Sequence, residues 1–446
     1  MRPVAMSRSV RINGPASVRG SIRIPGDKSI SHRILMLASI ASGTSRVTGL
    51  ASSADCRATL ECIRKLGIKV EESEAAVVIH GEGLFGYRAN EQPAHLDAGN
   101  SGSTIRMLSG LLAGQRFDSR IDGDDSLRRR PMARIIEPLS RMGARIDARD
   151  TNFAPLKIHG AALRGIDYQS PVASAQVKSC VLLAGLLAEG RTTFSEPAQS
   201  RNHTELMLEE MGAHIATNAS GLISVEGLND LNAIDYNVPG DVSSSAFFLA
   251  AASVLPNSEL LIKDVNLNPT RIAFIEALTS LGARIEKRNV RTQHSEPVGD
   301  LVVTSRPLRS ETPATILSGA IIPNIIDEIP ILAVVATQVE GRVEVRDAGE
   351  LRIKESDRIR TVAQGIRSLG GRVEEFEDGF AINGPQKLTG GRVESEGDHR
   401  IAMAFAIAGL IAQGTSEIAD ADCTNVSFPE FYETLAQASG PGVIER

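Results

Sequence analysis

The chain has 446 residues, about three times a typical ~150-residue domain, so two or three domains are expected. Hydrophobic residues make up 42% and charged residues 23%, a composition that is typical of a packed globular protein and excludes disorder for most of the chain. A net charge of −6 and the absence of tryptophan argue against a basic, aromatic nucleic-acid surface. We therefore expect no nucleic-acid partner.

Membrane and metal functions are also disfavoured. The N-terminal 13 residues lack an apolar stretch, and runs such as Ala402–Ala412 are shorter than the ~18 residues of a membrane span, which predicts a cytoplasmic protein without a membrane partner. The four cysteines, Cys56, Cys62, Cys180 and Cys423, show no metal-ligand spacing. Cys56 and Cys62 in a probable helix and Cys180 in an apolar run are expected to be buried thiols rather than part of a disulfide framework or a metal site.

A helix that stops at glycine and is followed by two strands recurs along the chain. Glycine suits the left-handed position just after a helix C-terminus. The glycines are Gly67, Gly143, Gly212, Gly282 and Gly370, spaced 69 to 88 residues apart. The second strands are expected at Val77–His80, Leu156–His159, Ile223–Glu226, Leu301–Thr304 and Phe380–Asn383.

A second pattern alternates with the first: a short strand, a polar or glycine-rich turn and an apolar helix. It covers Ile22–Gly43, Leu96–Gly114, Val172–Gly190, Tyr236–Asn257, Ile325–Gly341 and Val393–Gly414. Six units of about 74 residues predict an α/β fold in which one βαβαββ unit is repeated six times. Chance similarity among α/β segments is the alternative, but the two patterns stay in phase along the whole chain.

Six units divide into three plus three. Pro239-Gly240-Asp241 echoes Pro25-Gly26-Asp27, and Pro-Gly pairs favour turns. We predict one domain over residues 25–239 and a second over 1–24 plus 240–446, with hinges near 24–27 and 237–241. The second domain would need the N-terminal segment to complete its units.

The predicted helix starts carry polar and charged residues. Helix N-termini attract anions through unpaired N–H groups and the helix dipole. The first start has Lys28 at its mouth, with Ser29 and Arg33 four residues apart on one helical face. The second, Ala98–Arg106, is small and polar, as a close backbone approach to an anion requires, but it lacks the ending of a Walker P-loop.

Further candidates stand at later helix starts. They are Ala173–Lys178, Asp327 with Glu328, Glu396–Ala404, the run Arg128–Arg130, and Lys354 with Glu355 and Arg358, where Lys354 and Arg358 are expected on one helical face. Each has a plainer explanation: Ser29, Asn100 or Asp398 could cap a helix, the arginine run could be solvated, and Glu355 could form a routine pair with Arg358. Their joint placement in an acidic protein predicts a site for several phosphate or carboxylate groups.

These motifs resemble the 5-enolpyruvylshikimate-3-phosphate synthase family of enolpyruvyl transferases. The matching stretches are GDKSISHR (26–33), GNSGSTIR (99–106), RRP (129–131), SAQVKSCVLLAGL (174–186), IDEIPILAV (326–334), RIKESDRI (352–359), GDHRIAMA (397–404) and SFPEF (427–431). The resemblance implies two domains of three βαβαββ units each, forming an inside-out α/β barrel with a ligand cleft between the domains.

The resemblance also implies a reaction. The enolpyruvyl group of phosphoenolpyruvate would pass to the 5-hydroxyl of shikimate 3-phosphate with release of phosphate, the 3-phosphoshikimate 1-carboxyvinyltransferase step of aromatic amino acid biosynthesis. It implies these two small-molecule partners, inhibition by glyphosate, no metal or organic cofactor, and a monomer.

Site residues follow from the resemblance, motif by motif. Lys28, Asp327 and Glu355 would be catalytic, with Asp327 as the base on the attacking hydroxyl and Glu355 as the proton donor to the methylene. Shikimate 3-phosphate would be bound by Lys28, Ser29, Arg33, Ser174, Gln176, Ser200, Arg201, Asp327 and Lys354. Phosphoenolpyruvate would be bound by Lys28, Asn100, Gly102, Arg130, Gln176, Arg358 and Arg400.

Departures and alternatives remain. A tyrosine that some family members place near the shikimate ring is replaced by His203, and Ala175 removes one possible phosphate hydroxyl. The sister UDP-N-acetylglucosamine enolpyruvyl transferases carry a loop cysteine, whereas no cysteine lies between Cys62 and Cys180 here. A six-repeat scaffold that binds anionic metabolites without turnover is the non-enzyme alternative.

Overall fold

A computed structural model describes residues 9–89, 91 and 93–446, which form two compact units. The first, called the Lys28 unit, comprises Gly26–Pro239 and Thr292–Glu296. The second, called the Arg358 unit, comprises the chain up to Pro25, Gly240–Arg291 and Pro297–Arg446. The chain passes from one unit to the other within two Pro-Gly pairs, and again on either side of the short segment Thr292–Glu296. Hinge motion at these pairs stays a prediction.

Within the described residues, the strands form six four-stranded sheets with one common order. In each sheet the first two strands are parallel, and the other two are antiparallel to the neighbours they pair with. Where the two parallel strands of a sheet are consecutive in the chain, a helix connects them. Parallel strands require such a βαβ connection. The predicted α/β fold with a six-fold βαβαββ repeat is confirmed.

The Lys28 unit contains three of these sheets, counted over the residues described above. Its helices are α1 (Lys28–Ile40), α2 (Ala54–Lys65), α3 (Gly102–Ala113), α4 (Ala133–Arg141), α5 (Ala175–Leu186) and α6 (His203–Glu210). Its strands are β3 (Ser42–Thr48), β4 (Lys69–Glu72), β5 (Val77–Glu82), β6 (Ala94–Asp97), β7 (Ser119–Asp122), β8 (Arg145–Arg149), β9 (Phe153–His159), β10 (Asp167–Gln169), β11 (Arg191–Ser195), β12 (Ile215–Thr217), β13 (Ile223–Glu226) and β14 (Asp235–Asn237).

The Arg358 unit has the same plan. Its helices are α7 (Val242–Val254), α8 (Ala273–Ser280), α9 (Ile322–Ile325), α10 (Ile329–Ala336), α11 (Arg358–Ser368), α12 (His399–Ile411) and α13 (Phe431–Ser439). Its strands are β1 (Val10–Gly14), β2 (Arg19–Arg23), β15 (Glu259–Asn266), β16 (Arg284–Gln293), β17 (Glu296–Thr304), β18 (Leu308–Leu317), β19 (Val339–Val345), β20 (Glu374–Phe376), β21 (Gly379–Gly384), β22 (Arg392–Glu394), β23 (Gly414–Ala419) and β24 (Ile444–Glu445).

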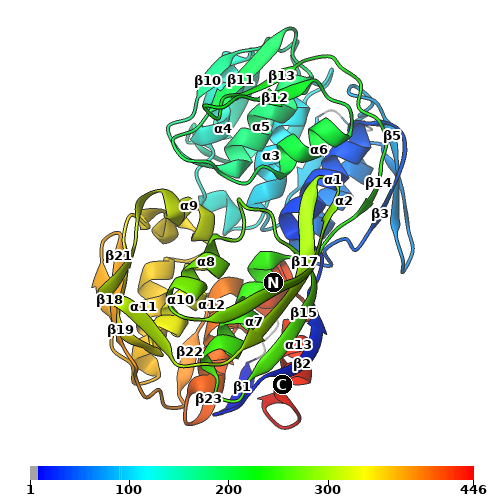
Figure 1. The fold of residues 1–446 in the computed structure, drawn as a ribbon. Coiled ribbons are helices and arrows are strands. Elements are labelled where there is room, and N and C mark those ends of the chain that lie inside the picture. The colour runs from blue at the N-terminus through cyan, green and yellow to red at the C-terminus, as the bar shows by residue number, and fades with distance from the viewer. Residues whose placement is uncertain (1–8, 90, 92) are drawn as a thin grey trace, which may run out of the picture. The chain divides into compact units, whose positions relative to one another are not determined.

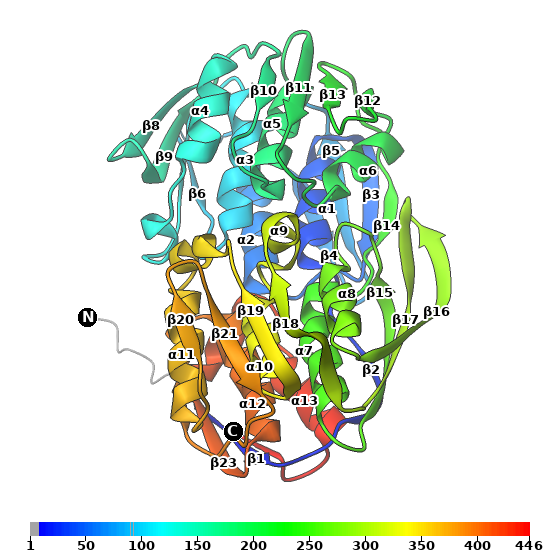
Figure 2. The same ribbon diagram turned by 60° about the vertical axis from the view of Figure 1, so that its left-hand side comes forward.

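Apolar helices form the centre of each unit. In Figure 1, α10 and α12 lie between β18, β19 and β21 on one side and β15 and β17 on the other. In Figure 2, α1, α3 and α5 take the same inner place in the Lys28 unit. These helices are apolar nearly all round, as buried helices are, and every residue of α12 is buried except Ile411. Helices α3 and α5 pack so closely that a Cβ at Gly110 would stand 2.3 Å from the carbonyl oxygen of Cys180.

Glycines end the outer helices as predicted. The five helix-end glycines have φ angles between +77° and +103°, which L residues with a side chain rarely adopt. A sixth, Gly440, follows α13 with φ +91°. It was not predicted, because the strands of that repeat are separated in the sequence: β1 pairs with β23 and β24 although it lies at the other end of the chain.

Two strands, β2 and β14, pair within the unit that the following helix does not belong to, and two expected strand positions, Val172 and Ile325, differ from the structure. Ile22 lies in β2, which precedes α1 in the chain but pairs with β15 of the Arg358 unit. Conversely, β14 leads into α7 but pairs with β3 of the Lys28 unit. Val172 and Ile325, expected in strands, lie outside them, since the corresponding strands are β10 and β18. Short apolar segments therefore indicated the repeat without showing which sheet each strand joins.

No single helix among the described residues is long and apolar enough to cross a membrane. One bent pair, Gly319–Ile325 with Ile329–Ala336, passes the same test by length and composition. Its second helix, α10, is buried along its whole length inside the Arg358 unit.

Candidate active site

Helix α1 brings together the cations of the first motif. Asp27 caps the helix by accepting a hydrogen bond from the Ile30 N–H at 3.0 Å, so Ser29 is not the cap. The Lys28 ammonium lies 2.9 Å from Oδ2 of Asp55, and Arg201 donates to the Ser29 hydroxyl at 3.2 Å. Lys28, Ser29 and Arg201, which the sequence analysis assigned to one ligand, are thus neighbours in the structure.

Arg33 is placed differently from its neighbours. Its side chain is buried, and its guanidinium donates to the hydroxyl of Thr204 at 2.7 Å, to the hydroxyl of Ser179 at 2.8 Å and to the carbonyl of Ser29 at 2.8 Å. These bonds tie α1 to α5 and α6. Arg33 therefore has a clear role in packing, and direct ligand binding by Arg33 remains a prediction.

A second arginine, Arg130, contacts Asn100 near the start of α3. Ser101 caps this helix by accepting from the Thr104 N–H at 3.1 Å, which leaves Asn100 to orient Arg130. Arg130 donates to Oδ1 of Asn100 at 2.7 Å and to its carbonyl at 3.3 Å. Arg130 is buried rather than solvated, whereas Arg128 of the same run is half exposed and pairs with Asp122.

Arg106 was missed by the sequence analysis. It donates to Oε1 of Gln176 at 2.7 Å, and Gln176 donates in turn to the hydroxyl of Ser103 at 3.0 Å. A Cβ at Gly102 would stand 2.8 Å from Nη1 of Arg106 and 3.5 Å from Nη1 of Arg130. The signal was present, since Arg106 follows Gly102 by four residues and so lies on the same helical face.

The two serines predicted to bind phosphate start α5 and precede α6. Ser174 caps α5 by accepting from the Val177 N–H at 3.5 Å. Ser200 donates both its N–H and its hydroxyl to Glu196, each at 2.8 Å. Glu196 was also missed by the sequence analysis, and its carboxylate is buried beside Lys178.

In the Arg358 unit, acidic side chains surround Arg358. The guanidinium contacts Oδ2 of Asp398 at 2.8 Å, Oε2 of Glu355 at 2.7 Å and Oδ1 of Asp327 at 3.4 Å. The side chain of Arg358 is only 2% exposed. Glu355 precedes α11, so its contact with Arg358 is part of this cluster and not a routine pair along one helix.

Arg358 keeps its positive charge in this setting. Burial alone would lower its pKa, but the carboxylates of Asp398, Glu355 and Asp327 outweigh burial and hold the pKa above its usual value. The cluster therefore presents a permanent cation between two carboxylates, Asp327 and Glu355, that the sequence analysis named as base and acid.

Arg400 contacts this arrangement through its backbone N–H, and the Lys354 ammonium lies 3.8 Å from Oε1 of Glu350. Arg400, near the start of α12, is buried 3.6 Å from Oε1 of Glu328 and stands over the ring of Phe247. Asp398 caps α12, accepting from the Arg400 N–H at 2.9 Å, and also binds Arg358. The expectation that Lys354 and Arg358 share a helical face is wrong, because α11 begins only at Arg358.

His203 has no access to solvent. It is fully buried, and its Nδ1 lies 2.7 Å from Oε1 of Glu296. Glu296 belongs to the short segment Thr292–Glu296 that packs with the Lys28 unit. His203 thus fills a structural position here.

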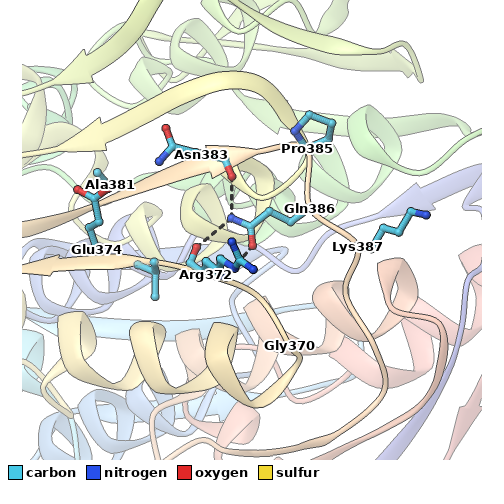
Figure 3. Close-up of a pocket in the computed structure, with 9 residues that line it drawn as sticks. Gly370, Arg372, Glu374, Ala381, Asn383, Pro385, Gln386 and Lys387 are labelled. Atoms are coloured by element: carbon cyan, nitrogen blue, oxygen red, sulfur yellow. Dashed lines mark hydrogen bonds between the residues drawn. The ribbon is translucent and has the colours of Figure 1, made fainter.

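A cavity of about 620 Å³ lies elsewhere, on the Arg358 unit beside β20 and β21 (Figure 3). Its lining includes Arg372, Asn383 and Lys387, and none of the predicted site residues. Gln386 also lines it and bonds both the N–H and the carbonyl of Arg372. Among the described residues, no three His, Cys, Asp or Glu side chains are grouped in a way that could hold a metal ion.

Comparison with known proteins identifies the family. The model of the EPSP synthase family, 3-phosphoshikimate 1-carboxyvinyltransferase, matches residues 12–435. The chain belongs to the EPSP synthase family. It is 50% identical over 426 residues to the 3-phosphoshikimate 1-carboxyvinyltransferase of Solibacter usitatus, covering 95% of this chain and 98% of that protein. It is 48% identical to the Bacillus subtilis protein of the same name, with 95% and 98% covered.

The solved structures agree with this assignment. EPSP synthase from Acinetobacter baumannii superposes with a TM-score of 0.86 at 40% sequence identity, covering 98% of this chain and 99% of that one. The α/β architecture with its six repeated units is therefore the fold of the EPSP synthase family.

Proposed function

We propose that this protein transfers the enolpyruvyl group of phosphoenolpyruvate to the 5-hydroxyl of shikimate 3-phosphate and releases phosphate. The observation that carries the proposal is Arg358, a buried cation in contact with Asp327 and Glu355. Relatives named for this reaction match 95% of the chain, which supports the same assignment.

The chemistry is an addition followed by an elimination. In the addition, the 5-hydroxyl oxygen bonds to C2 of phosphoenolpyruvate, the hydroxyl loses its proton, and C3 gains one to become a methyl group. In the elimination, the bond from C2 to the phosphate oxygen breaks, and the methyl group loses a proton to restore the double bond. Atoms and charge balance with an acid, a base and cations, so the reaction as written needs no cofactor.

The Arg358 unit would supply the proton transfers. Asp327 takes the proton of the attacking hydroxyl, and Glu355 donates one to C3. Arg358 contacts both carboxylates and stabilises the anion that Glu355 becomes after it has given up its proton. Arg358 and Arg400 bind the anionic groups of phosphoenolpyruvate, and Lys354 binds shikimate 3-phosphate.

The Lys28 unit would supply anion and hydroxyl recognition. Shikimate 3-phosphate binds Lys28, Ser29, Arg33, Ser174, Gln176, Ser200 and Arg201, and phosphoenolpyruvate binds Lys28, Asn100, Gly102, Arg130 and Gln176. Asn100 and Gln176 hold Arg130 and Arg106 through amide oxygens, which fixes the direction of the guanidinium forks without a formal negative charge. Arg106 joins this set as a residue that orients Gln176.

A phosphate-release assay tests the proposal. The purified protein is expected to release phosphate from phosphoenolpyruvate when shikimate 3-phosphate is present, and to release none when it is left out. UDP-N-acetylglucosamine, the acceptor of the sister enzymes, should not replace it. Turnover with UDP-N-acetylglucosamine, or with neither acceptor, would contradict the proposal.

Cytoplasmic location, a monomeric state and inhibition by glyphosate belong to the same proposal. The free thiols of Cys56, Cys62, Cys180 and Cys423 suit a reducing compartment. Light scattering of the purified protein tests the monomer, and competition between glyphosate and phosphoenolpyruvate tests the inhibition.

A further inference from the structure

A buried charged cluster lies behind the two serines that the proposed function assigns to the phosphate of shikimate 3-phosphate. Lys178 on α5 is 1% exposed, and its ammonium contacts Oε1 of Glu196 at 3.0 Å, Oε1 of Glu205 at 2.8 Å and the carbonyl of Ser200 at 3.1 Å. An ammonium has three N–H donors, so these acceptors satisfy it fully. Glu196 and Glu205 are 6% and 9% exposed, and Lys178 supplies the counter-charge that buried carboxylates require.

Glu196 connects the two serine segments. It follows β11 directly and begins the loop that leads to α6. Its Oε1 accepts from the N–H and the hydroxyl of Ser200, each at 2.8 Å, and its Oε2 accepts from the N–H of Ser174 at 3.3 Å. A single carboxylate thus sets the distance between the start of α5 and the loop that carries Ser200.

The same bonds decide where the hydroxyl protons point. A serine hydroxyl has one proton, and a carboxylate only accepts, so the Ser200 proton is directed to Glu196. Ser174 gives Glu196 its N–H instead, and its hydroxyl accepts from Val177, so its own proton remains for another acceptor. Ser200 can donate to a ligand only by turning its hydroxyl away from Glu196, while its backbone stays tied.

We propose that Glu196 is a positioning residue for the phosphate-binding serines, held in place by Lys178. Glu205 belongs to the same cluster and contacts Lys178. None of the hydrogen bonds described above joins Glu205 to Ser174 or Ser200. The inference rests on the proposed function, because it takes shikimate 3-phosphate as the ligand. It predicts that loss of Glu196 weakens recognition of the phosphate group and leaves the chemistry of phosphoenolpyruvate unchanged.

The test replaces each carboxylate by its amide. Glu196→Gln keeps the shape of the side chain but cannot accept at both ends, so the KM for shikimate 3-phosphate should rise roughly tenfold or more, as loss of charge-assisted hydrogen bonds implies. The KM for phosphoenolpyruvate and kcat at saturation should stay within about twofold of the parent protein, inside the scatter of such measurements. Glu209→Gln, an exposed position on α6, controls for the substitution itself.

Two comparisons separate positioning from mere stability. Glu205→Gln should lower the unfolding midpoint as Glu196→Gln does, with a clearly smaller change in the KM for shikimate 3-phosphate. Titration with shikimate, which lacks the phosphate, should give equal dissociation constants for the parent protein and for Glu196→Gln. Glu196→Asp, which keeps the charge beside Lys178, should recover part of the loss and serves if the amide variant does not fold.

The outcomes are distinguishable. If the parent protein neither binds nor turns over shikimate 3-phosphate, the proposed function fails. If the parent protein is active and the folded Glu196 variants show an unchanged KM for shikimate 3-phosphate, the positioning role is wrong and the cluster is only structural. Equal KM changes for Glu196→Gln and Glu205→Gln, or an equal loss of shikimate affinity, would also overturn it.

Discussion

The two units share one repeat, but the arginines of their candidate sites have different hydrogen-bond partners. In the Arg358 unit, Arg358 contacts carboxylates at Asp398, Glu355 and Asp327. In the Lys28 unit, Arg130 and Arg106 are oriented by the amide oxygens of Asn100 and Gln176. A carboxylate cancels the charge of the cation it binds, whereas an amide orients a cation and leaves its charge in place. We therefore propose that the Arg358 unit is organised for proton transfer and the Lys28 unit for holding anions.

The largest effect is expected from removing the acid and base of the Arg358 unit. Glu355→Gln and Asp327→Asn keep shape and some hydrogen bonding but cannot exchange a proton, so kcat should fall by ~10²–10⁴-fold. Steady-state phosphate release measures it, with Glu340→Gln on an exposed part of β19 as control. An unfolding curve beside the kinetics separates this loss from instability. Near-normal turnover in both variants would remove these residues from the proton-transfer roles.

Replacing one arginine in each unit by methionine compares the units through the loss of unfolding free energy. Arg358→Met leaves buried carboxylates without their counter-charge and should cost about 3–5 kcal/mol of unfolding free energy. Arg130→Met removes the hydrogen bonds to Asn100 and should cost about 1–3 kcal/mol. Urea denaturation measures both, and Arg360→Met, an exposed arginine on α11 that pairs with Glu396, should cost at most about 1 kcal/mol. Equal losses for Arg358→Met and Arg130→Met would break the contrast between the units.

Gly102 tests how tightly the Lys28 unit packs around its arginines. Gly102 begins α3 and does not have a left-handed φ, so alanine brings no backbone strain. The added methyl would press on Nη1 of Arg106, and overpacking of this kind costs ~1–3 kcal/mol. Glyphosate is longer than phosphoenolpyruvate, so its inhibition constant should rise more than the KM for phosphoenolpyruvate. Competition kinetics measures the two; equal increases would defeat the steric explanation.

The smallest effect concerns a neutral histidine in the Lys28 unit. His32 Nδ1 lies 2.7 Å from the hydroxyl of Thr59, which continues through Thr104 to Ser101, the cap of α3. Burial, reinforced by the charges of Lys28 and Arg33, lowers the pKa of His32 well below its usual value. Below about pH 6.5, His32 is protonated in the unfolded chain but stays neutral in the folded protein. The free energy of unfolding therefore decreases as the pH falls, by at most ~1.4 kcal/mol per pH unit.

Replacing this histidine removes its share of the pH dependence. His32→Asn keeps an atom near the position of Nδ1 but does not titrate, so its stability should fall less steeply than that of the parent protein between pH 6.5 and 5. Urea denaturation at a series of pH values measures the difference in slope. Parallel curves for the two proteins would show that His32 is not held neutral.

Many residues of the candidate site could be named from the sequence because they stand at or near helix starts, although their roles stay predictions. Lys28 and Asn100 lie at or near the starts of the apolar helices α1 and α3. Arg130 and Arg358 lie near or at the starts of the amphipathic helices α4 and α11. Arg106 and Glu196 were missed because their contacts join distant segments: Arg106 binds Gln176, 70 residues away, and Glu196 binds Ser174 and Lys178, 22 and 18 residues away. The spacing of Arg106 from Gly102 indicated only which helical face it lies on. The burial of Arg33 was not foreseen either, since an arginine within a polar motif gives no indication that it packs against Thr204 and Ser179.

The sequence by itself determined the repeat, the class of fold, the helix ends and the family motifs. These follow from local physical chemistry: apolar periodicity, side-chain caps and glycines with positive φ act within a few residues of each other. Only the tertiary structure decided that β2 joins β15, that β14 joins β3, and that β1 completes a sheet with β23 near the other end of the chain. Strand pairing depends on backbone hydrogen bonds between distant segments, and any strand of suitable pattern offers the same donors and acceptors.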